Sequence, residues 1–227
     1  LYCPANNDTW TIENGKWNGY NAEKWYPDAV AYGYCGAEEG GKNLSWTLTE
    51  DETLTISGTG EMADYEWNSE KFESSAPWYE HKDNIKTLVL ENGITHIGNR
   101  AFSRCFYLSG ELVIPEGVTS IGDSAFNNTA FTGELVLPSS LEVIGSGAFI
   151  SNDFEGDLVL PENLEHIFGY AFSGCEFTNV EIPAAVKTVG GGIFSDVKNN
   201  ITVSEENTNY CSVDGVVFTK DATKLVC

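Results

Sequence analysis

The sequence predicts an α/β, β-rich solenoid, and a repeat of 23 residues is the main reason. Three consecutive copies fill residues 111–179: ELVIPEGVTSIGDSAFNNTAFTG, ELVLPSSLEVIGSGAFISNDFEG and DLVLPENLEHIFGYAFSGCEFTN. The same aliphatic position recurs at Leu112, Leu135 and Leu158. An aromatic content of 12% also indicates that the chain packs a core. A fixed period of this length with recurring aliphatic residues is typical of a leucine-rich-repeat solenoid.

The residues before the repeat are expected to close its first end. In the aromatic-rich N-terminal segment, residues 1–34, the dipeptide Asn14-Gly15 within TWTIENGKWNGY predicts a hairpin. Residues 35–84 are expected to form an N-terminal β-hairpin cap, because LSWTL and TLTIS alternate on either side of the turn TEDE. A solenoid end exposes apolar core, so a cap is physically required there.

The leucine-rich repeats are expected to occupy residues 85–200 as about five right-handed rungs. Each rung starts with an alternating LVIP-type strand that ends at a proline, which cannot donate to a sheet ladder. A V-x-x-I-G element follows, and a short helical turn, x-x-A-F, then places its Phe in the core, as at Phe126. Gly110, Gly133 and Gly156 are expected to turn the chain into the next strand.

The C-terminal segment, residues 201–227, is predicted to form a hairpin around Asp214-Gly215. Its strands would place six residues on one face: Cys211, Val213, Val216, Phe218, Leu225 and Cys227. The last residues, TKLVC, stop in an apolar run, and the first, LYCPANNDTW, contain no signal peptide. We therefore expect a truncated chain that belongs to a longer protein.

The chain is strongly acidic, with 12 Lys and Arg against 34 Asp and Glu and a formal charge of −22. Such a surface repels phosphates, so neither nucleic-acid binding nor docking on an anionic membrane is expected. No run of 18 apolar residues occurs, so membrane insertion is not expected either. Solubility is the simplest explanation of the acidity.

Six cysteines invite a disulfide framework, but the repeat argues against most pairs. Cys105 and Cys175 lie three rungs apart, which at roughly 4.8 Å per rung is about 14 Å and exceeds the roughly 7 Å limit of a disulfide. We expect both to be small buried hydrophobic residues. A bridge between Cys3 and Cys35 stays open, as does the redox compartment.

Catalytic and cofactor motifs are missing, including C-x-x-C, H-E-x-x-H, G-x-S-x-G and a phosphate loop. His96 and His166 share a surface column but lie three rungs apart, too far to share a metal ion. Asp153, Glu155 and Asp157 offer oxygen ligands for calcium, but Asp153 and Glu155 are expected in the turn and no calcium-loop motif accompanies them, so a solvated acidic edge is favoured. We expect no enzyme, no metal site and no cofactor.

The string LVIPEGVTSIGDSAF resembles the BspA-like class of leucine-rich repeat, L-x-I-P-x-x-V-x-x-I-G-x-x-A-F. LSWTLTEDETLTISGTGEM and NTNYCSVDGVVFTKDATKLV resemble the hairpins that lead and trail that class, so the resemblance covers residues 35–227. It implies a secreted or surface protein of bacteria or of some protists that acts in adhesion or in binding proteins and matrix. The family often packs Cys or Thr three residues after the Phe of the A-F pair. Asn152 stands in that column and must find hydrogen-bond partners inside its rung.

The strand face offers the main candidate site, because the alternation of E-L-V-I-P points Glu and Val outward. Stacked rungs would expose two ladders. The first consists of Thr87, Glu111, Glu134, Asp157 and Asn179. The second consists of Val89, Val113, Val136, Val159 and Glu181. An apolar stripe beside an acidic one suits a basic, partly apolar partner. Against this, valine is a good strand former, and four exposed valines make only a small patch.

We therefore predict a non-catalytic, extracellular or cell-surface module, monomeric, that binds a protein or extracellular matrix partner. Its predicted binding residues are Glu111, Val113, Glu134, Val136, Asp157, Val159 and Glu181. One alternative is a carbohydrate-binding module in which Trp10, Trp17 and Trp25 stack on the sugar rings of a glycan. A second alternative is a structural spacer in a larger surface protein. The N-terminal aromatic residues would otherwise belong to the cap.

Overall fold

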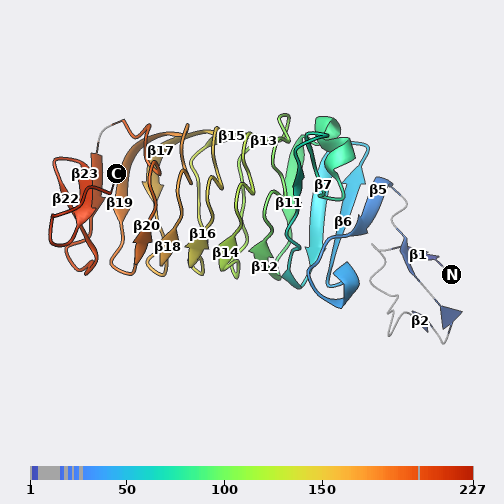
Figure 1. Ribbon diagram of the computed structural model, residues 1–227. Coiled ribbons are helices and arrows are strands. Elements are labelled where there is room, and N and C mark those ends of the chain that lie inside the picture. Colours follow the sequence, from blue (N-terminus) through green and yellow to red (C-terminus); the bar gives the residue numbers. More distant parts are fainter. Residues whose placement is uncertain are drawn as a thin grey trace.

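The computed structural model describes residues 2–4, 16–17, 20–21, 23–25, 28–198 and 200–226, with side chains from residue 28 onward except Glu39. Figure 1 shows rungs stacked along one axis, with the C-terminal hairpin at one end and the N-terminal strands at the other. The rungs consist of strands and turns. The prediction of a β-rich repeat solenoid is therefore confirmed.

A six-stranded parallel sheet runs along one side of the stack in the order β20-β18-β16-β14-β12-β8. Its strands are β8 (Gly60–Glu61), β12 (Ile94–Ile97), β14 (Ser120–Ile121), β16 (Val143–Ile144), β18 (His166–Ile167) and β20 (Thr188–Val189). All but β8 come from the V-x-x-I-G elements, or V-x-x-V-G in the last rung, and each of the five predicted rungs contributes one.

A second parallel sheet has the order β13-β15-β17-β19-β21. Its strands are β13 (Ser109–Gly110), β15 (Ala130–Gly133), β17 (Asp153–Val159), β19 (Glu176–Ile182) and β21 (Asn200–Val203). Gly156 was predicted to turn the chain, but it lies inside β17 with φ of 83°. The register shifts between Gly156 and Leu158, which marks a bulge rather than a turn.

The N-terminal hairpin extends the first rung as a four-stranded sheet in the order β11-β7-β6-β5. Its strands are β5 (Ala29–Tyr34), β6 (Leu44–Thr49), β7 (Thr53–Gly58) and β11 (Thr87–Leu90). The two middle strands pair antiparallel across the TEDE turn, and β7 pairs parallel with the first LVIP-type strand, β11. The hairpin therefore provides the edge on which the solenoid starts.

Short elements complete the N-terminal part of the chain. Before the hairpin, β1 (Tyr2–Pro4) pairs parallel with β4 (Glu23–Trp25), and β2 (Lys16–Trp17) pairs antiparallel with β3 (Tyr20–Asn21). After it, β9 (Trp67–Asn68) and β10 (Glu73–Ser74) form a small antiparallel pair. The hairpin predicted around Asn14-Gly15 lies outside the described residues.

The rung turns are not helical, so the α/β label and the helical turn predicted for each rung are wrong. Among the described residues the helices are two 3₁₀ segments that precede the rungs, η1 (Glu39–Gly41) and η2 (Tyr79–Asn84). In an α-helix each N–H bonds to the carbonyl four residues earlier. In the first x-x-A-F turn the N–H groups of Arg100, Phe102 and Arg104 instead donate to carbonyls of the next rung, each at 2.8 Å. Every second N–H group of the turn thus donates a hydrogen bond to the neighbouring rung instead of to its own turn.

A column of stacked aromatic rings forms the centre of the core. The Phe residues of the five A-F or I-F pairs stack with Trp78 at their head, at centroid distances of 5.3–5.9 Å: Trp78, Phe102, Phe126, Phe149, Phe172 and Phe194. A second column of Phe131, Phe154 and Phe177 has spacings of 6.3 and 6.4 Å. The sequence predicted inward Phe residues, but it indicated neither this second column nor the place of Trp78.

Asn152 confirms the expectation of a polar residue with hydrogen bonds inside a rung. It is 1% exposed, and its Nδ2 donates to the carbonyls of Phe126 at 2.8 Å and Phe149 at 3.0 Å. Its Oδ1 accepts a short hydrogen bond from the Thr129 hydroxyl. Every polar atom of the amide therefore has a partner, so its burial is not penalised by an unmade hydrogen bond.

The described thiols are free. Cys35, Cys105 and Cys175 are buried and unbridged, so the bridge considered between Cys3 and Cys35 is absent. Burial raises the pKa of all three thiols to about 12. The prediction that Cys105 and Cys175 act as small buried hydrophobic residues agrees with their burial and lack of a bridge.

The C-terminal hairpin consists of β22 (Tyr210–Val213) and β23 (Val216–Thr219), paired antiparallel around the predicted turn. Its side chains close the last rung. The N–H of Val189 donates to the Tyr210 hydroxyl, which donates to the carbonyl of Lys187, both at 3.1 Å. The buried Asn207 donates to the carbonyls of Pro183 and Val186 at 2.8 and 3.1 Å. Side chains of the C-terminal segment therefore provide hydrogen-bond partners for backbone groups of the last rung.

The ring column leads to a first prediction. Phe149→Ala removes a fully buried ring that contacts rings in both neighbouring rungs. We expect the free energy of unfolding to fall by about 3–5 kcal/mol, as measured by urea denaturation. The matched control is Phe106→Ala, because Phe106 is exposed and its loss should change stability by less than about 0.5 kcal/mol. Equal losses in both variants would contradict the role of the column.

The thiols lead to a second prediction. Alkylation requires the thiolate, and with a pKa of about 12 only on the order of one thiol in 10⁴ is ionised at pH 8. Iodoacetamide should therefore label half-buried Cys211 in the native protein, and label Cys105 and Cys175 only in denaturant, as read by peptide mass spectrometry.

The same pKa shift has a consequence for stability. Because folding raises these pKa values above 9.0, the stability contributed by the neutral thiols is present below pH 9 and is lost as the pH rises towards 12. Labelling of Cys105 at the rate of Cys211 in the native protein would contradict its enclosure.

Candidate functional site

The ladder face is the name used here for Glu111, Val113, Glu134, Val136, Asp157, Val159 and Glu181. Its three valines point to solvent, with exposed fractions of 70% for Val113, 68% for Val136 and 75% for Val159. The residues on either side in the chain, such as Leu112 and Ile114, are buried. The alternation of the LVIP-type segments is thus the cause of the exposed stripe.

Register places the ladder residues in rows across the rungs. Val113 bridges Val136 in parallel, and Val159 pairs with Glu181. Glu181 pairs in turn with Thr202 of β21, so the row continues beyond the last predicted ladder residue. The structure therefore brings Val113 beside Val136 and Val159 beside Glu181, while the ends of the face lie several rungs apart.

Among the described residues, no carboxylate of the ladder face has a cationic partner. The lysine ion pairs in this part of the chain involve Glu52, Asp83, Glu165 and Glu176, none of which belongs to the ladder face. Asp157 accepts a hydrogen bond from Asn179 Nδ2 at 2.8 Å, which fixes its carboxylate at the rung edge. The face is therefore an apolar stripe with uncompensated negative charge along it.

A hollow of about 450 Å³ opens in the ladder face at its C-terminal end. Asp157, Val159, Asn179 and Glu181 line it, together with residues of and beyond β21: Asn200, Thr202 and Ser204. These last three residues were not predicted as site residues, because Asn200 ends the predicted repeats and Thr202 and Ser204 follow them. Their alternation in NITVS was the available signal, since it continues the strand pattern for one more row.

The acidic edge proposed for calcium has a different geometry from the one expected. Asp153 and Glu155 were placed in a turn, but they lie in β17 and pair with Thr132 and Glu176 of the neighbouring strands. Strand geometry holds their side chains beside the rungs instead of curling them around an ion. In the described parts of the chain, no group of three or more His, Cys, Asp or Glu residues could hold a metal ion.

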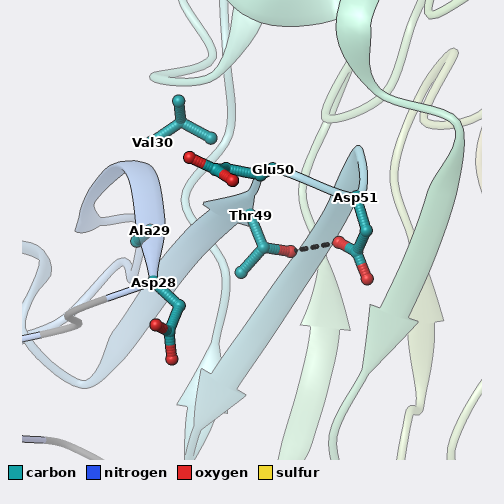
Figure 2. Close-up of a pocket in the computed structure, with 6 residues that line it drawn as sticks. All are labelled: Asp28, Ala29, Val30, Thr49, Glu50 and Asp51. Carbon is teal, nitrogen blue, oxygen red and sulfur yellow. Dashed lines mark hydrogen bonds between the residues drawn. The ribbon is translucent and has the colours of Figure 1, made fainter.

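A second hollow, of about 500 Å³, lies where β5 begins and β6 ends (Figure 2). Asp28, Ala29, Val30, Thr49, Glu50 and Asp51 line it. The Thr49 hydroxyl donates to Asp51 at 2.6 Å, and this hydrogen bond lowers the pKa of Asp51. The bond closes the turn between β6 and β7, so we assign these residues to the turn.

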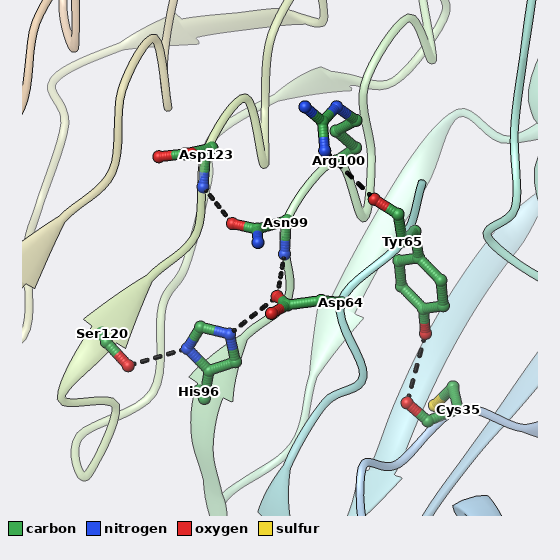
Figure 3. A network of polar contacts seen from close by, with 8 residues as sticks. All are labelled: Cys35, Asp64, Tyr65, His96, Asn99, Arg100, Ser120 and Asp123. Carbon is green, nitrogen blue, oxygen red and sulfur yellow. Dashed lines mark hydrogen bonds and ion pairs between the residues drawn. The ribbon is translucent and has the colours of Figure 1, made fainter. Parts of the chain in front are cut away.

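Polar side chains tie the cap to the first two rungs (Figure 3). His96 contacts Ser120 Oγ through Nδ1 at 2.7 Å and Asp64 Oδ1 through Nε2 at 3.3 Å. Asp64 also accepts the N–H of Asn99 at 2.7 Å, and Asn99 Oδ1 accepts the N–H of Asp123 at 2.5 Å. The side chains of Asp64 and Asn99 thus each accept a hydrogen bond from a backbone N–H of the next rung.

Asp64, His96 and Ser120 are the three residue types of a hydrolase catalytic triad, but their contacts do not have the geometry of a triad. In that triad Nε2 faces the serine and Nδ1 faces the carboxylate, which is the reverse of the contacts here. His96 and Ser120 are direct partners in the sheet register, and His166 pairs with Thr188 in the same column, with Nδ1 2.9 Å from the hydroxyl. The contacts follow from the repeat, so we assign them to rung stacking. His96 and His166 lie in one column, as the sequence predicted.

The tryptophans of the carbohydrate alternative cannot be placed as a group. Trp10 lies outside the described residues, and only the backbones of Trp17 and Trp25 are described, in β2 and β4. A stacking site at these residues stays a prediction. No helix among the described residues is long and apolar enough to cross a membrane.

Stacked rungs, two parallel sheets and a recurring A-F turn define a leucine-rich-repeat protein. The BspA type leucine rich repeat region matches residues 74–202 in six copies. The chain therefore belongs to the BspA type leucine-rich-repeat family.

Solved structures of other leucine-rich-repeat proteins are similar. One from Eubacterium ventriosum is 30% identical, with a TM-score of 0.68, over 84% of this chain and 49% of its own. The pneumococcal vaccine antigen PcpA is 19% identical, with a TM-score of 0.50, over 79% of this chain and 53% of its own, and shares the fold. The chain thus spans about half the length of these structures. No curated protein matches the sequence.

The polar network leads to a third prediction. Asp64→Ala removes the acceptor of both the Asn99 N–H and His96. We expect the free energy of unfolding to fall by about 1–2 kcal/mol and the Asn99 amide to exchange faster with deuterium. Glu66→Ala is the control, since this neighbouring exposed carboxylate accepts no such bond. Unchanged exchange at Asn99 would show that Asp64 does not anchor the first rung.

Proposed function

We propose that this chain is a non-catalytic binding module that recognises a protein or matrix partner through the ladder face. The observation behind the proposal is the combination of exposed Val113, Val136 and Val159 with carboxylates that have no cationic partner among the described residues. A leucine-rich-repeat protein of this family is expected to bind or to support rather than to catalyse, since its surface consists of repeated rows.

The chemistry of the ladder face favours a basic and partly apolar partner. Covering the valines removes apolar surface from water, at roughly 25 cal/mol per Å². The carboxylates attract a cationic partner from a distance and favour its correct orientation. The hollow beside Val159 and Glu181 offers a place for one projecting side chain. These features support a partner that lies across several rungs.

The location and the role of the flanking segments are part of the same proposal. The BspA type family supports a secreted or cell-surface protein, in which residues 35–84 and 201–227 act as the caps of the repeats. The competing role is that of a spacer in a larger surface protein. A spacer needs a stable stack but no particular residue on the ladder face, so a substitution on that face separates the two roles.

The proposal leads to a fourth prediction. A partner is first selected by screening the purified chain against an array of matrix proteins and basic peptides. Val113→Lys combined with Val136→Lys should then weaken binding at least about tenfold, because ammonium groups replace the apolar stripe and neutralise the nearby carboxylates. Surface plasmon resonance measures the affinity. The association rate of the unchanged chain should fall as salt is raised from 50 to 500 mM.

Val213→Lys serves as the matched control, because this valine is 53% exposed but lies in the C-terminal hairpin. The control should bind like the unchanged chain, and all variants should keep their melting temperature. Unchanged affinity in the Val113 and Val136 double variant would reject the ladder face as the binding surface. An array without any bound protein or peptide would favour the spacer.

A further inference from the structure

The fourth rung departs from the repeat just after β18, in two places. The V-x-x-I-G elements of the other rungs end in a glycine, at Gly98, Gly122, Gly145 and Gly190, whereas the fourth rung has Phe168. The residue before the A-F or I-F pair is Arg100, Ser124, Gly147 or Gly192 elsewhere, and Tyr170 here. Phe168 is 42% exposed and Tyr170 59% exposed. The fourth rung thus has a solvent-exposed ring where the other rungs have glycine, and a second exposed ring two residues later.

Neighbouring contacts hold these rings in place. The ring of Phe168 stacks with that of His166, with centroids 6.2 Å apart and an interplanar angle of 17°. His166 is itself fixed by Thr188, whose hydroxyl lies 2.9 Å from Nδ1. Tyr170 lies against Gly192, where an added Cβ would approach the Tyr ring to 2.6 Å. The row of His166, Phe168 and Tyr170 thus consists of alternate residues of one rung, and the next rung has no side chain at Gly192 to displace the Tyr170 ring.

The fold itself gains little from the two rings. Tyr170 has φ of 60°, but this position is left-handed in every rung, with φ of 57° at Arg100, 55° at Ser124, 60° at Gly147 and 67° at Gly192, so the conformation belongs to the turn and does not require an aromatic residue. Neither ring enters the core, which Phe172 fills in the same rung. Two large apolar side chains that the fold leaves in water are a candidate contact surface for a ligand.

We propose that His166, Phe168 and Tyr170 form a stacking platform for the neutral sugar rings of an oligosaccharide. An aromatic ring carries negative charge on its face, and the C–H groups on one side of a sugar ring are weakly positive, so the two pack face to face. The Thr188 hydroxyl and the Glu165–Lys187 ion pair, 2.6 Å long, border the row and offer hydrogen bonds to sugar hydroxyls. Apolar rings with a few polar groups at their edge are the usual composition of a small-ligand site.

Charge and shape favour this ligand over two others. A formal charge of −22 and the carboxylate of Glu165 beside His166 disfavour sugars that carry acids or sulfates. A stable protein interface buries about 800 Å² on each partner and needs a core of side chains. Here the fifth rung has Gly190, Gly191 and Gly192 beside the row, so this rung adds no side chains that would widen it. A linear glycan chain needs no wider surface.

The test uses a variant that restores the residues of the other rungs, Phe168→Gly with Tyr170→Gly. The unchanged chain is screened on an array of neutral and acidic glycans, and the best neutral oligosaccharide is titrated by calorimetry. We expect affinity for a neutral glycan, a loss of at least tenfold in the double variant, and an unchanged or higher melting temperature. The matched control, Phe106→Ser with Tyr107→Ser, removes two similarly exposed rings and should keep the affinity.

Each other outcome overturns the proposal. No neutral glycan bound, a preference for acidic glycans, or full affinity in the double variant would reject the platform as a neutral-sugar site. A double variant with a lowered melting temperature would assign the rings to stability instead. Loss of a protein partner with no effect on glycan binding would make the row part of a protein interface. The Val113→Lys and Val136→Lys variant should keep its glycan affinity, so this test is independent of the ladder face.

Discussion

Adjacent rungs approach within backbone hydrogen-bonding distance along three lines: the six-stranded sheet, the five-stranded sheet and the x-x-A-F turn. This close approach leaves no room for side chains at certain positions. A Cβ at Gly122 or Gly145 would lie 2.5 Å from backbone atoms of the preceding rung. The same spacing stacks one Phe ring per rung at 5.3–5.9 Å in the core. Core, turns and sheets therefore depend on one rung-to-rung distance.

The period of 23 residues was sufficient to predict features that every rung shares. It located the inward Phe residues and the alternation of the LVIP-type segments, but it did not identify the V-x-x-I-G elements as the strands of the six-stranded sheet. It could not show whether the turn would bond to itself or along the stack, because both arrangements bury the same residues. The prediction of a helical turn was therefore wrong. The N–H groups of residues such as Phe102 donate to carbonyls of the next rung instead of to carbonyls of a helix.

Features outside the period were harder to predict. Trp78 replaces a Phe at the head of the ring column, but its segment has no repeat from which its position could be read. Asn200 and Thr202 line the hollow of the ladder face although Asn200 ends the predicted repeats and Thr202 follows them. Of the predicted site, the outward direction of Val113 and Val136 followed from alternation, whereas the hollow arises from how the final strand ends the stack.

A repeat makes surfaces in two ways, and this chain contains both. Where the repeat is kept, one outward residue per rung becomes a long row, as in the ladder face. Where the repeat is broken, a single rung carries a local feature, as at Phe168 and Tyr170. Asp157 and Val159 of the ladder face lie in β17 of the five-stranded sheet, whereas Phe168 and Tyr170 of the same rung follow β18 of the six-stranded sheet. Because neither surface contributes rings or valines to the core, each can change in sequence while the rung spacing, and with it the fold, stays intact.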